Sequence, residues 1–212
     1  FGLYTMLQHQ NKIQINPTNT IQLNYEKTDS SRVALTQAEM QELYKACKTL
    51  QEKAILALGY GCGLRVNEMV QCNIADVRIR EHLLIVPKGK NNKSRTVPMS
   101  KTVAKDLSNY FYKVRLQQNS NERSAFIVNT KGRRMQQWTY NKILQKLIDR
   151  TGNEGIKMKQ LSIHNLRHSI ATHLIEQAAP LERVKEFLGH ADIETTEIYT
   201  HISQQQLQQL VE

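Results

Sequence analysis

One short segment breaks the helical pattern that runs through most of this chain. From Leu35 onward, apolar residues recur mostly at three- and four-residue spacing, which is typical of amphipathic helices. Residues 77–86 are instead rich in Val, Ile and Leu, residues 88–92 read Lys-Gly-Lys-Asn-Asn, and an extended pattern resumes at 95–97. Such runs on either side of turn residues predict a β-hairpin. We therefore expect a mainly α fold with a small antiparallel β-sheet (α+β).

Capping signals mark the first helix of the series. Thr36 is followed three residues later by Glu39, the spacing of a capping box, in which each side chain accepts a hydrogen bond from a backbone N–H at the helix start. This pair predicts a helix over 37–48. Apolar spacing predicts further helices over 54–58, 103–114, 143–148, 164–178 and 181–188, the last ended by Gly189, and a short one from Asp192 to Tyr199.

Three glycines within residues 59–63 interrupt the helical pattern just before Arg65. Glycine adopts tight-turn conformations at little steric cost, so we expect a sharp turn here. Another helix should open over 64–68, which places Arg65 at a helix start, where free backbone N–H groups favour an anion. An ordinary reading is also open, in which Arg65 pairs with Glu68 three residues on.

Basic residues outnumber acidic residues by 29 to 19, which leaves a net charge of +10. A surplus of this size is typical of proteins that bind polyanions. The charge is also segregated, because residues 85–101 hold five basic residues and no acid, whereas residues 176–199 hold six acids and two basic residues. This favours a nucleic-acid partner over a generally basic solvated surface, the alternative that composition alone leaves open.

The composition also bears on location. No apolar run approaches the ~20 residues that a membrane-spanning helix needs, and no signal peptide opens the chain. The three cysteines, Cys47, Cys62 and Cys72, are odd in number and lack paired metal-ligand spacing, which fits a reducing compartment. We expect an intracellular, cytoplasmic protein that has no contact with a membrane.

A set of polar side chains predicts chemistry at a phosphate. It comprises two arginines, two histidines, a tyrosine and a lysine of the hairpin tip: Arg65, Arg167, His164, His190, Tyr199 and one of the lysines in 88–93. The set has no carboxylate pair, so Mg²⁺, which prefers oxygen ligands, is not expected. Arginine forks bind phosphate oxygens and can stabilise the extra negative charge of a five-coordinate phosphorus transition state.

Tyr199 is the expected nucleophile of such a reaction. A phenol with an ordinary pKa of about 10 needs a nearby base or a strongly positive pocket in order to attack at neutral pH. His164 can serve as the base, and it shares a helix face with Arg167, three residues on. A lysine on a hairpin tip can protonate the leaving oxygen as the bond breaks.

Each of these residues also has an ordinary structural reading. Tyr199 alone could be a half-buried core tyrosine, and Trp138 and Tyr140 read as core residues rather than stacking platforms. Three histidines in one predicted helix have no Cys or carboxylate at zinc-ligand spacing, so no metal site is expected. Two of them, His168 and His173, should be packing or surface residues.

Four separated boxes together resemble the catalytic boxes of tyrosine recombinases, the family of Xer proteins and phage integrases. They are Gly63-Leu64-Arg65-Val66-Asn67-Glu68, His164-Asn165-Leu166-Arg167-His168-Ser169, Leu188-Gly189-His190 and Tyr199, in the family's order. The resemblance covers residues 34–212 and implies a catalytic domain with a C-terminal tail helix there. It implies that residues 1–33 are the remnant of an N-terminal core-binding domain and the interdomain linker.

The resemblance also implies an activity and its partners. The family's enzymes cleave and rejoin DNA strands through a covalent 3′-phosphotyrosyl intermediate, without metal or cofactor, on double-stranded DNA with specific recombination sites. They act as a synaptic tetramer, in which the C-terminal segment, here 203–212, packs on a neighbouring protomer. A type IB topoisomerase and a DNA-binding regulator that does not cut are the alternatives. The role, in a mobile element, a phage or the resolution of chromosome dimers, stays open.

The catalytic lysine is the least certain match to the family. The family's hairpin typically reads Lys-Gly-x-Lys-x-Arg, whereas this one runs from Lys88 to Arg95 and is two residues longer. Counting back from residues 97–98 favours Lys90, which we take as the catalytic lysine, and counting forward from the strand favours Lys88. The other basic residues predicted to contact DNA are Lys88, Lys93, Arg95, Arg133 and Arg134.

Overall fold

The structure is a computed structural model that describes residues 2–15, 33–87, 94–118 and 120–189. The chain divides into two compact units, Phe1–Ser31 and Arg32–Glu212. The first unit contains helix α1 (Gly2–His9). All the elements described below belong to the second unit.

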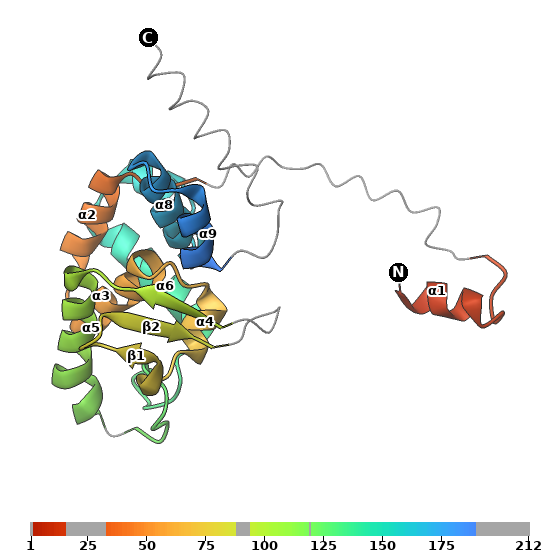
Figure 1. Cartoon of the computed structure of the whole chain (residues 1–212), viewed down its shortest axis with the longest axis horizontal. Coiled ribbons are helices and arrows are strands. Elements are labelled where there is room, and N and C mark those ends of the chain that lie inside the picture. Colours follow the sequence, from red (N-terminus) through yellow and green to blue (C-terminus); the bar gives the residue numbers. More distant parts are fainter. Residues whose placement is uncertain (1, 16–32, 88–93, 119, 190–212) are drawn as a thin grey trace, which may run out of the picture. The chain divides into compact units, whose positions relative to one another are not determined.

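The second unit is mainly helical with one small sheet, as the sequence predicts (Figure 1). Its α-helices are α2 (Gln37–Ala46), α3 (Leu50–Leu56), α4 (Val66–Gln71), α5 (Lys101–Lys113), α6 (Gln137–Thr151), α7 (Glu154–Met158), α8 (Ile163–Glu176) and α9 (Leu181–Leu188). A π-helical turn, η1 (Ala57–Gly61), continues α3, and two 3₁₀ turns are η2 (Ile74–Asp76) and η3 (Arg115–Gln117). The strands are β1 (Val77–Arg78), β2 (Leu83–Val86) and β3 (Arg95–Pro98).

Capping boxes begin the first two helices of this unit. The Glu39 N–H donates to Thr36 Oγ1 over 3.2 Å, and the Thr36 N–H donates to Glu39 Oε2 over 2.7 Å. The predicted helix over 37–48 is therefore confirmed, with its end at residue 46. A second box, Thr49 with Glu52, begins α3 at residue 50, four residues before the predicted start.

The sheet is antiparallel with the strand order β1-β2-β3 (Figure 1). Leu84 pairs with Val77 on one side and with Val97 on the other, which confirms the predicted hairpin of β2 and β3. The expectation of one strand over 77–86 was wrong, because a turn divides that segment in two. In the turn the His82 N–H donates to the Ile79 carbonyl over 3.2 Å, and His82 has a φ of 54°.

Helix α6 corrects one prediction about the core. Tyr140 is fully buried, as expected, and its hydroxyl donates to the Met69 carbonyl over 3.2 Å. Trp138 was also expected in the core, but 66% of it is exposed. The two residues are two positions apart, which is about 200° around a helix, so they face opposite sides. The buried stripe of α6 continues through Leu144 and Leu147.

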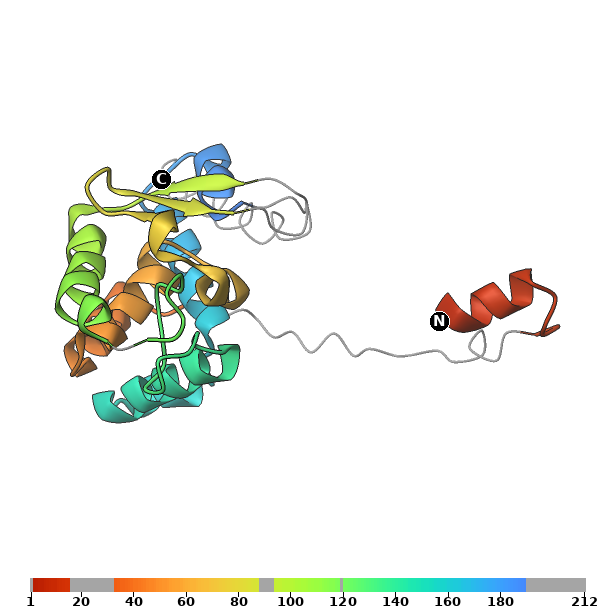
Figure 2. The ribbon, with the colours of Figure 1, turned by 90° about the horizontal axis from the view of Figure 1, so that it is seen from below.

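The helices pack on both sides of a continuous apolar core. Figure 2 shows the sheet on one side of the unit and α6 on the other. A smaller apolar cluster joins α8 to α9 through Ala171, Ile175, Val184 and Leu188. Gly189, with a φ of 66°, ends α9 as predicted. In the part of the chain that the structure describes, no helix is long and apolar enough to cross a membrane.

Candidate active site

A π-helical turn and a glycine carry the chain from α3 to Arg65. The Cys62 N–H donates to the Ala57 carbonyl over 2.8 Å, which closes the wide turn. Gly63 follows with a φ of 59°, and a Cβ there would lie 2.9 Å from Leu188 Cδ2. Glycine adopts this backbone without strain and leaves room for α9. The glycine-rich segment therefore makes the predicted turn and sets Arg65 at the start of α4.

Arg65 is held by the carboxylate of Glu68. Its N–H donates to Glu68 Oε2 over 2.8 Å, and its Nη1 donates to Oε1 over 3.1 Å. The side chain of Arg65 keeps 39% of its exposure, whereas that of Glu68 keeps 13%. The ion pair of the ordinary reading is thus present, and the guanidinium also faces solvent.

Arg95 binds the same carboxylate from β3. Its Nη1 donates to Glu68 Oε1 over 2.7 Å and its Nη2 to Oε2 over 2.8 Å, which is a bidentate pair. Its Nε donates to the Phe187 carbonyl near the end of α9 over 3.1 Å. Arg95 was predicted to contact DNA, and here its guanidinium connects α4, β3 and α9.

Arg167 is the buried arginine of the group, with 6% exposure. Its Nη1 donates to the Gly63 carbonyl and its Nη2 to the Leu188 carbonyl, each over 2.6 Å. Nη1 also lies 3.9 Å from Glu68 Oε2. Arg167 therefore connects α8 to the glycine turn and to the end of α9, directly before the segment that contains His190.

The structure thus brings both predicted catalytic arginines to one carboxylate. Burial alone would raise the pKa of Glu68, but the hydrogen bonds and charge of Arg95, the Arg65 N–H and the charge of Arg167 hold it at about 2. Three guanidiniums around one ionised carboxylate leave a local surplus of two positive charges. We call this group of four residues the Glu68 cluster. Its surplus charge suits a phosphate, which is anionic.

His164 lies one helical turn from Arg167 but differs from it in exposure. It is exposed in the first turn of α8, whereas Arg167 is buried. The Asn141 side chain of α6 fixes this helix start, because its Oδ1 accepts the N–H of Ile163 over 3.0 Å. The predicted base is therefore presented at the surface of the same helix that contributes the buried arginine.

Several predicted site residues lie outside the described residues. They are the hairpin lysines and the C-terminal pair: Lys88, Lys90, Lys93, His190 and Tyr199. The predicted helices from Asp192 and over the tail also fall there. The elements that flank these segments are β2, which ends at Val86, β3, which begins at Arg95, and α9, which is capped by Gly189.

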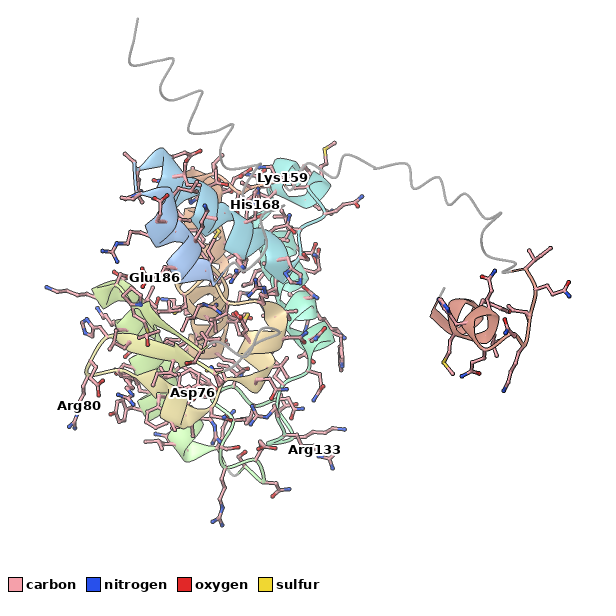
Figure 3. The ribbon with its side chains drawn as sticks, turned by 45° about the vertical axis from the view of Figure 1, so that its right-hand side comes forward. Asp76, Arg80, Arg133, Lys159, His168 and Glu186 are labelled. Atoms are coloured by element: carbon pink, nitrogen blue, oxygen red, sulfur yellow. The ribbon has the colours of Figure 1, made fainter. Side chains whose placement is uncertain are left out.

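The two remaining basic residues differ from each other. Arg134 Nη1 donates to the Val70 carbonyl over 2.8 Å, and its Nη2 donates to Asn73 Oδ1 over 2.7 Å, so it links its loop to the end of α4. Arg133 is exposed, and Figure 3 shows it extending away from the ribbon. Of these two predicted DNA contacts, Arg133 has the more accessible guanidinium.

The sequence analysis did not identify Glu68 as a functional residue. It recognised the motif 63–68 that contains Glu68, but it treated the carboxylate only as an ordinary ion-pair partner of Arg65. The available signal was the position of Glu68 three residues after Arg65 at a predicted helix start, where a carboxylate is favoured. The two arginines that make Glu68 the centre of a cluster, Arg95 of β3 and Arg167 of α8, are distant from it in the sequence.

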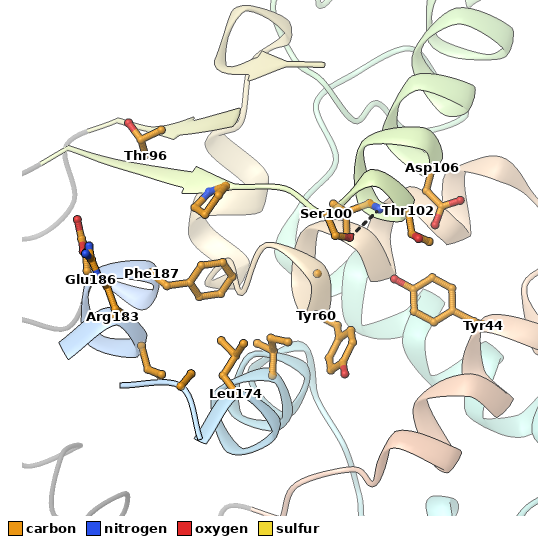
Figure 4. A pocket seen from close by; sticks show the side chains of 16 residues that line it. Tyr44, Tyr60, Thr96, Ser100, Thr102, Asp106, Leu174, Arg183, Glu186 and Phe187 are labelled. Atoms are coloured by element: carbon orange, nitrogen blue, oxygen red, sulfur yellow. Dashed lines mark hydrogen bonds and ion pairs between the residues drawn. The ribbon is translucent and has the colours of Figure 1, made fainter. Parts of the chain in front are cut away.

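An apolar pocket of about 740 Å³ is lined by residues of β3, α5, α8 and α9 (Figure 4). Tyr60, Leu174 and Phe187 face it, and α9 forms one of its walls. At its edge the Tyr60 hydroxyl and His173 Nδ1 are 2.9 Å apart, and His173 is buried, as a packing residue would be. His168 is half-buried. Among the described residues, no group of three or more His, Cys, Asp or Glu could hold a metal ion.

Comparisons with known proteins identify one family and its relatives. Residues 34–206 match the model of the phage integrase family. The chain is 39% identical over 164 residues to tyrosine recombinase XerD of Oceanobacillus iheyensis, covering 76% of this chain and 54% of that protein. It is 34% identical over 215 residues to tyrosine recombinase XerC of Herpetosiphon aurantiacus, covering 95% and 66%.

Solved structures show the same fold. The crystal structure of XerA recombinase matches with a TM-score of 0.73 at 28% identity, over 84% of this chain and 62% of that one. A structure of the XerH site-specific recombinase bound to its difH substrate matches with a TM-score of 0.76 at 23% identity, over 99% and 63%. The chain spans between about half and two thirds of the length of these proteins.

Proposed function

The chain belongs to the phage integrase family, and from this premise we propose that residues 34–212 are the catalytic domain of a tyrosine recombinase. The enzyme cleaves and rejoins strands of double-stranded DNA at specific recombination sites, in the cytoplasm of a prokaryote. The observation that carries the proposal is the Glu68 cluster, in which Arg65 Nη1 lies 3.1 Å and Arg167 Nη1 3.9 Å from oxygens of one carboxylate.

The charge of the cluster suits this chemistry. A phosphodiester carries one negative charge, and attack on phosphorus adds a second in the five-coordinate transition state. Preorganised donors aimed at developing charge lower the barrier most when they need not move. The hydrogen bonds of Arg167 to two backbone carbonyls hold its guanidinium in place. We assign Glu68 as the positioning residue that keeps the arginines together.

The remaining catalytic residues supply the nucleophile and the proton transfers. The phenol oxygen of Tyr199 attacks phosphorus while His164 accepts the phenol proton. The bond from phosphorus to the 5′ oxygen breaks, and Lys90 gives that oxygen a proton. His190 donates a further hydrogen bond to the phosphate. A 5′ hydroxyl from another strand then attacks the phosphotyrosyl bond and releases Tyr199, so no cofactor has to supply energy.

The other predicted DNA contacts divide into two kinds. We propose that Lys88, Lys93 and Arg133 bind backbone phosphates, which gives affinity that falls with salt. Arg95 and Arg134, whose guanidiniums bind protein groups, hold the DNA-binding surface in shape rather than contacting many phosphates themselves.

We further propose that the active form is a tetramer on DNA. The tail carries an apolar edge of Ile202, Leu207, Leu210 and Val211, and the pocket beside α9 has an apolar lining large enough for a few such side chains. The tail of one protomer then fills the pocket of its neighbour. Deleting 203–212 should weaken assembly on a two-site DNA in sedimentation velocity, and unchanged assembly would contradict this docking.

A suicide substrate tests the reaction itself. The full 212-residue chain is incubated with a library of duplexes that have randomised arms and a nick, so that the cleaved end diffuses away and the covalent adduct accumulates. We expect an adduct that survives denaturation by detergent and is lost in Tyr199→Phe. Arg167→Ala should lower its yield at least ~100-fold, the scale expected when a preorganised donor is removed.

Matched variants control for indirect effects. Tyr112→Phe removes the hydroxyl of an exposed tyrosine, and Arg150→Ala removes an arginine that pairs with Glu52 instead of Glu68. Both should keep the adduct. An adduct that persists in Tyr199→Phe would refute the assignment of the nucleophile. Relaxation of a plasmid without recombination sites would favour a topoisomerase, and DNA binding with no adduct would favour a regulator.

A further inference from the structure

A short segment before α2 is bonded to α8, the helix of the second predicted catalytic arginine. We call residues 33–35 the entry segment. The Leu35 N–H donates to Ser169 Oγ over 2.8 Å, and Asn165 Nδ2 donates to the Val33 carbonyl over 3.0 Å. These bonds join residues that are 134 and 132 positions apart in the chain. The entry segment is therefore held by tertiary contacts with α8.

The entry segment is anchored where water has little access. Leu35 is 1% exposed and Ser169 is fully buried, so water cannot replace the hydrogen bond between them. Ser169 Oγ donates in turn to the Asn165 carbonyl over 2.7 Å. Lys159 Nζ donates to the Ala34 carbonyl over 3.4 Å, so each residue of the entry segment has a bonded backbone group.

Asn165 also holds the start of α8. Its Oδ1 accepts the N–H and the hydroxyl of Ser162, the residue before the helix, each over 2.9 Å. One side-chain amide therefore uses its oxygen to begin α8 and its nitrogen to bind the entry segment. His164, the predicted base, lies in the helical turn between these two residues. A shift of the entry segment would therefore displace the turn that presents His164.

The opposite side of the same stretch of α8 belongs to the Glu68 cluster. Asn165 and Ser169 are four residues apart, so they share a helix face. Arg167 is two residues from each of them, which is about 200° around the helix. Its guanidinium binds the carbonyls of Gly63 and Leu188. This part of α8 is thus held between the entry segment on one side and the glycine turn on the other.

We propose that Asn165 and Ser169 are positioning residues of the cleavage reaction. They fix α8 to the entry segment and so set where His164 and Arg167 meet the reacting phosphate. The inference rests on the proposed function, because cleavage is the reaction that it concerns. The entry segment lies at the end of the predicted interdomain linker, so a displacement of the linker reaches the active site through these two residues.

Two variants break the two bonds separately. Asn165→Asp keeps an oxygen that accepts the Ser162 N–H and removes the amide that donates to Val33. The helix start is retained, because a carboxylate suits this position. Ser169→Ala removes the hydroxyl that accepts the Leu35 N–H.

Matched controls lose equivalent bonds in another part of the fold. Gln51→Glu removes a side-chain amide that donates to the Val128 carbonyl over 2.7 Å, and it adds the same charge as Asn165→Asp. Thr49→Ala removes a hydroxyl that accepts the Glu52 N–H over 3.1 Å.

The first measurement separates chemistry from binding. The rate of adduct formation is measured with the full chain in single turnover, at a saturating concentration of the nicked duplex that the library selects. Affinity for that duplex is measured by the anisotropy of a dye on the DNA. Both variants should lower the rate at least ~10-fold, because a small misplacement of reacting groups is costly. Affinity should stay unchanged, and the controls should change neither quantity. Equal losses of rate in the controls, or a loss of affinity that matches the loss of rate, would overturn the proposal.

The second measurement needs no DNA. Amide hydrogen exchange should rise about tenfold in peptides that cover residues 33–36 and 162–166, and it should rise in both together, because loss of one bond releases both segments. Exchange over α5 should not change. A rise in only one of the two peptides would show that the entry segment and the start of α8 are not coupled, which would reject the proposal.

The outcomes also distinguish this inference from the proposed function. Adduct formation at the wild-type rate in both variants would reject the positioning role and leave the recombinase assignment intact. A wild-type chain that forms no adduct would reject the proposed function, and the positioning role with it.

Discussion

Three glutamates of this molecule occupy the same local position and differ in what surrounds them. Glu39, Glu52 and Glu68 are each the third residue of a helix, and each accepts the N–H of the residue before that helix, over 2.7, 3.1 and 2.8 Å. This position favours a carboxylate because it satisfies a free backbone donor and lies at the positive end of the helix. The local sequence thus gives all three the same structural part.

Their charged partners separate them. Glu39 meets Lys159 at 2.7 Å, and Glu52 meets Arg150 at 2.8 Å, so within the described parts of the chain each of these carboxylates pairs with one cation. Glu68 meets three arginines. The first two pairs are neutral and hold helices together, whereas the third group keeps a positive surplus. A capping residue therefore becomes part of a candidate active site when more cations converge on it than it can neutralise.

Removing the charge of Glu68 should cause the largest loss of stability and activity among the changes that test this comparison. Glu68→Gln keeps the shape of the side chain and removes the negative charge that three arginines share, two of them with side chains only 13% and 8% exposed. We expect about 3 kcal/mol less stability in urea unfolding, the scale for breaking a buried pair on one side. The yield of the DNA adduct should fall at least tenfold, because the arginines lose their common anchor.

Glu52→Gln is the matched control for that variant. Its single arginine is 31% exposed and can turn to water, so the expected loss is about 1 kcal/mol. The adduct yield should stay unchanged, since Arg150 takes no part in the chemistry. Equal losses of activity in the two variants would show that both carboxylates act through general stability, and the distinction between them would fail.

The sequence predicts the contacts of Glu68 with residues near it in the chain, but not its contacts with residues far from it in the chain. The glycine turn, the helix start at Arg65 and the pairing with Glu68 follow from residues within ten positions of one another. Arg95 and Glu68 are 27 residues apart, and their bidentate pair depends on how β3 packs against α4 and α9. Sequence spacing carries no information about such packing, so Arg95 could only be read as one more basic residue.

The wrong prediction for Trp138 shows a second limit, in this case of helical periodicity. Tyr140, Leu144 and Leu147 set the buried stripe of α6, and Trp138 falls outside its phase. Near the end of a helix, one apolar residue fits two phases almost equally well, so spacing alone did not choose between them. The mainly α fold, the hairpin and the cap at Gly189 depended on longer or stronger signals and are confirmed.

Acid down to pH 3 should remove only part of the Glu68 contribution, so it should sharpen the comparison by a smaller amount. Burial raises the pKa of each of these three glutamates, but hydrogen bonds and cations outweigh it, so all three pKa values are lowered from 4.5, that of Glu68 to about 2. A carboxyl with a lower pKa in the folded state contributes stability that is fully present above pH 4.5. That contribution is lost as the pH falls towards 2. For Glu68 it is about 3 kcal/mol.

Urea unfolding between neutral pH and pH 3 therefore tests how the cations are distributed. The wild-type chain should lose stability as the pH falls through this range, because the unfolded state takes up protons that the folded carboxylates do not. Glu68→Gln should flatten the profile more than Glu52→Gln does, since the guanidiniums of Arg95 and Arg167 and the Arg65 N–H hold the Glu68 pKa at about 2, whereas one guanidinium, that of Arg150, helps two backbone N–H groups to lower the Glu52 pKa. If the two variants flattened it equally, the three arginines would give Glu68 no electrostatic advantage over an ordinary helix cap.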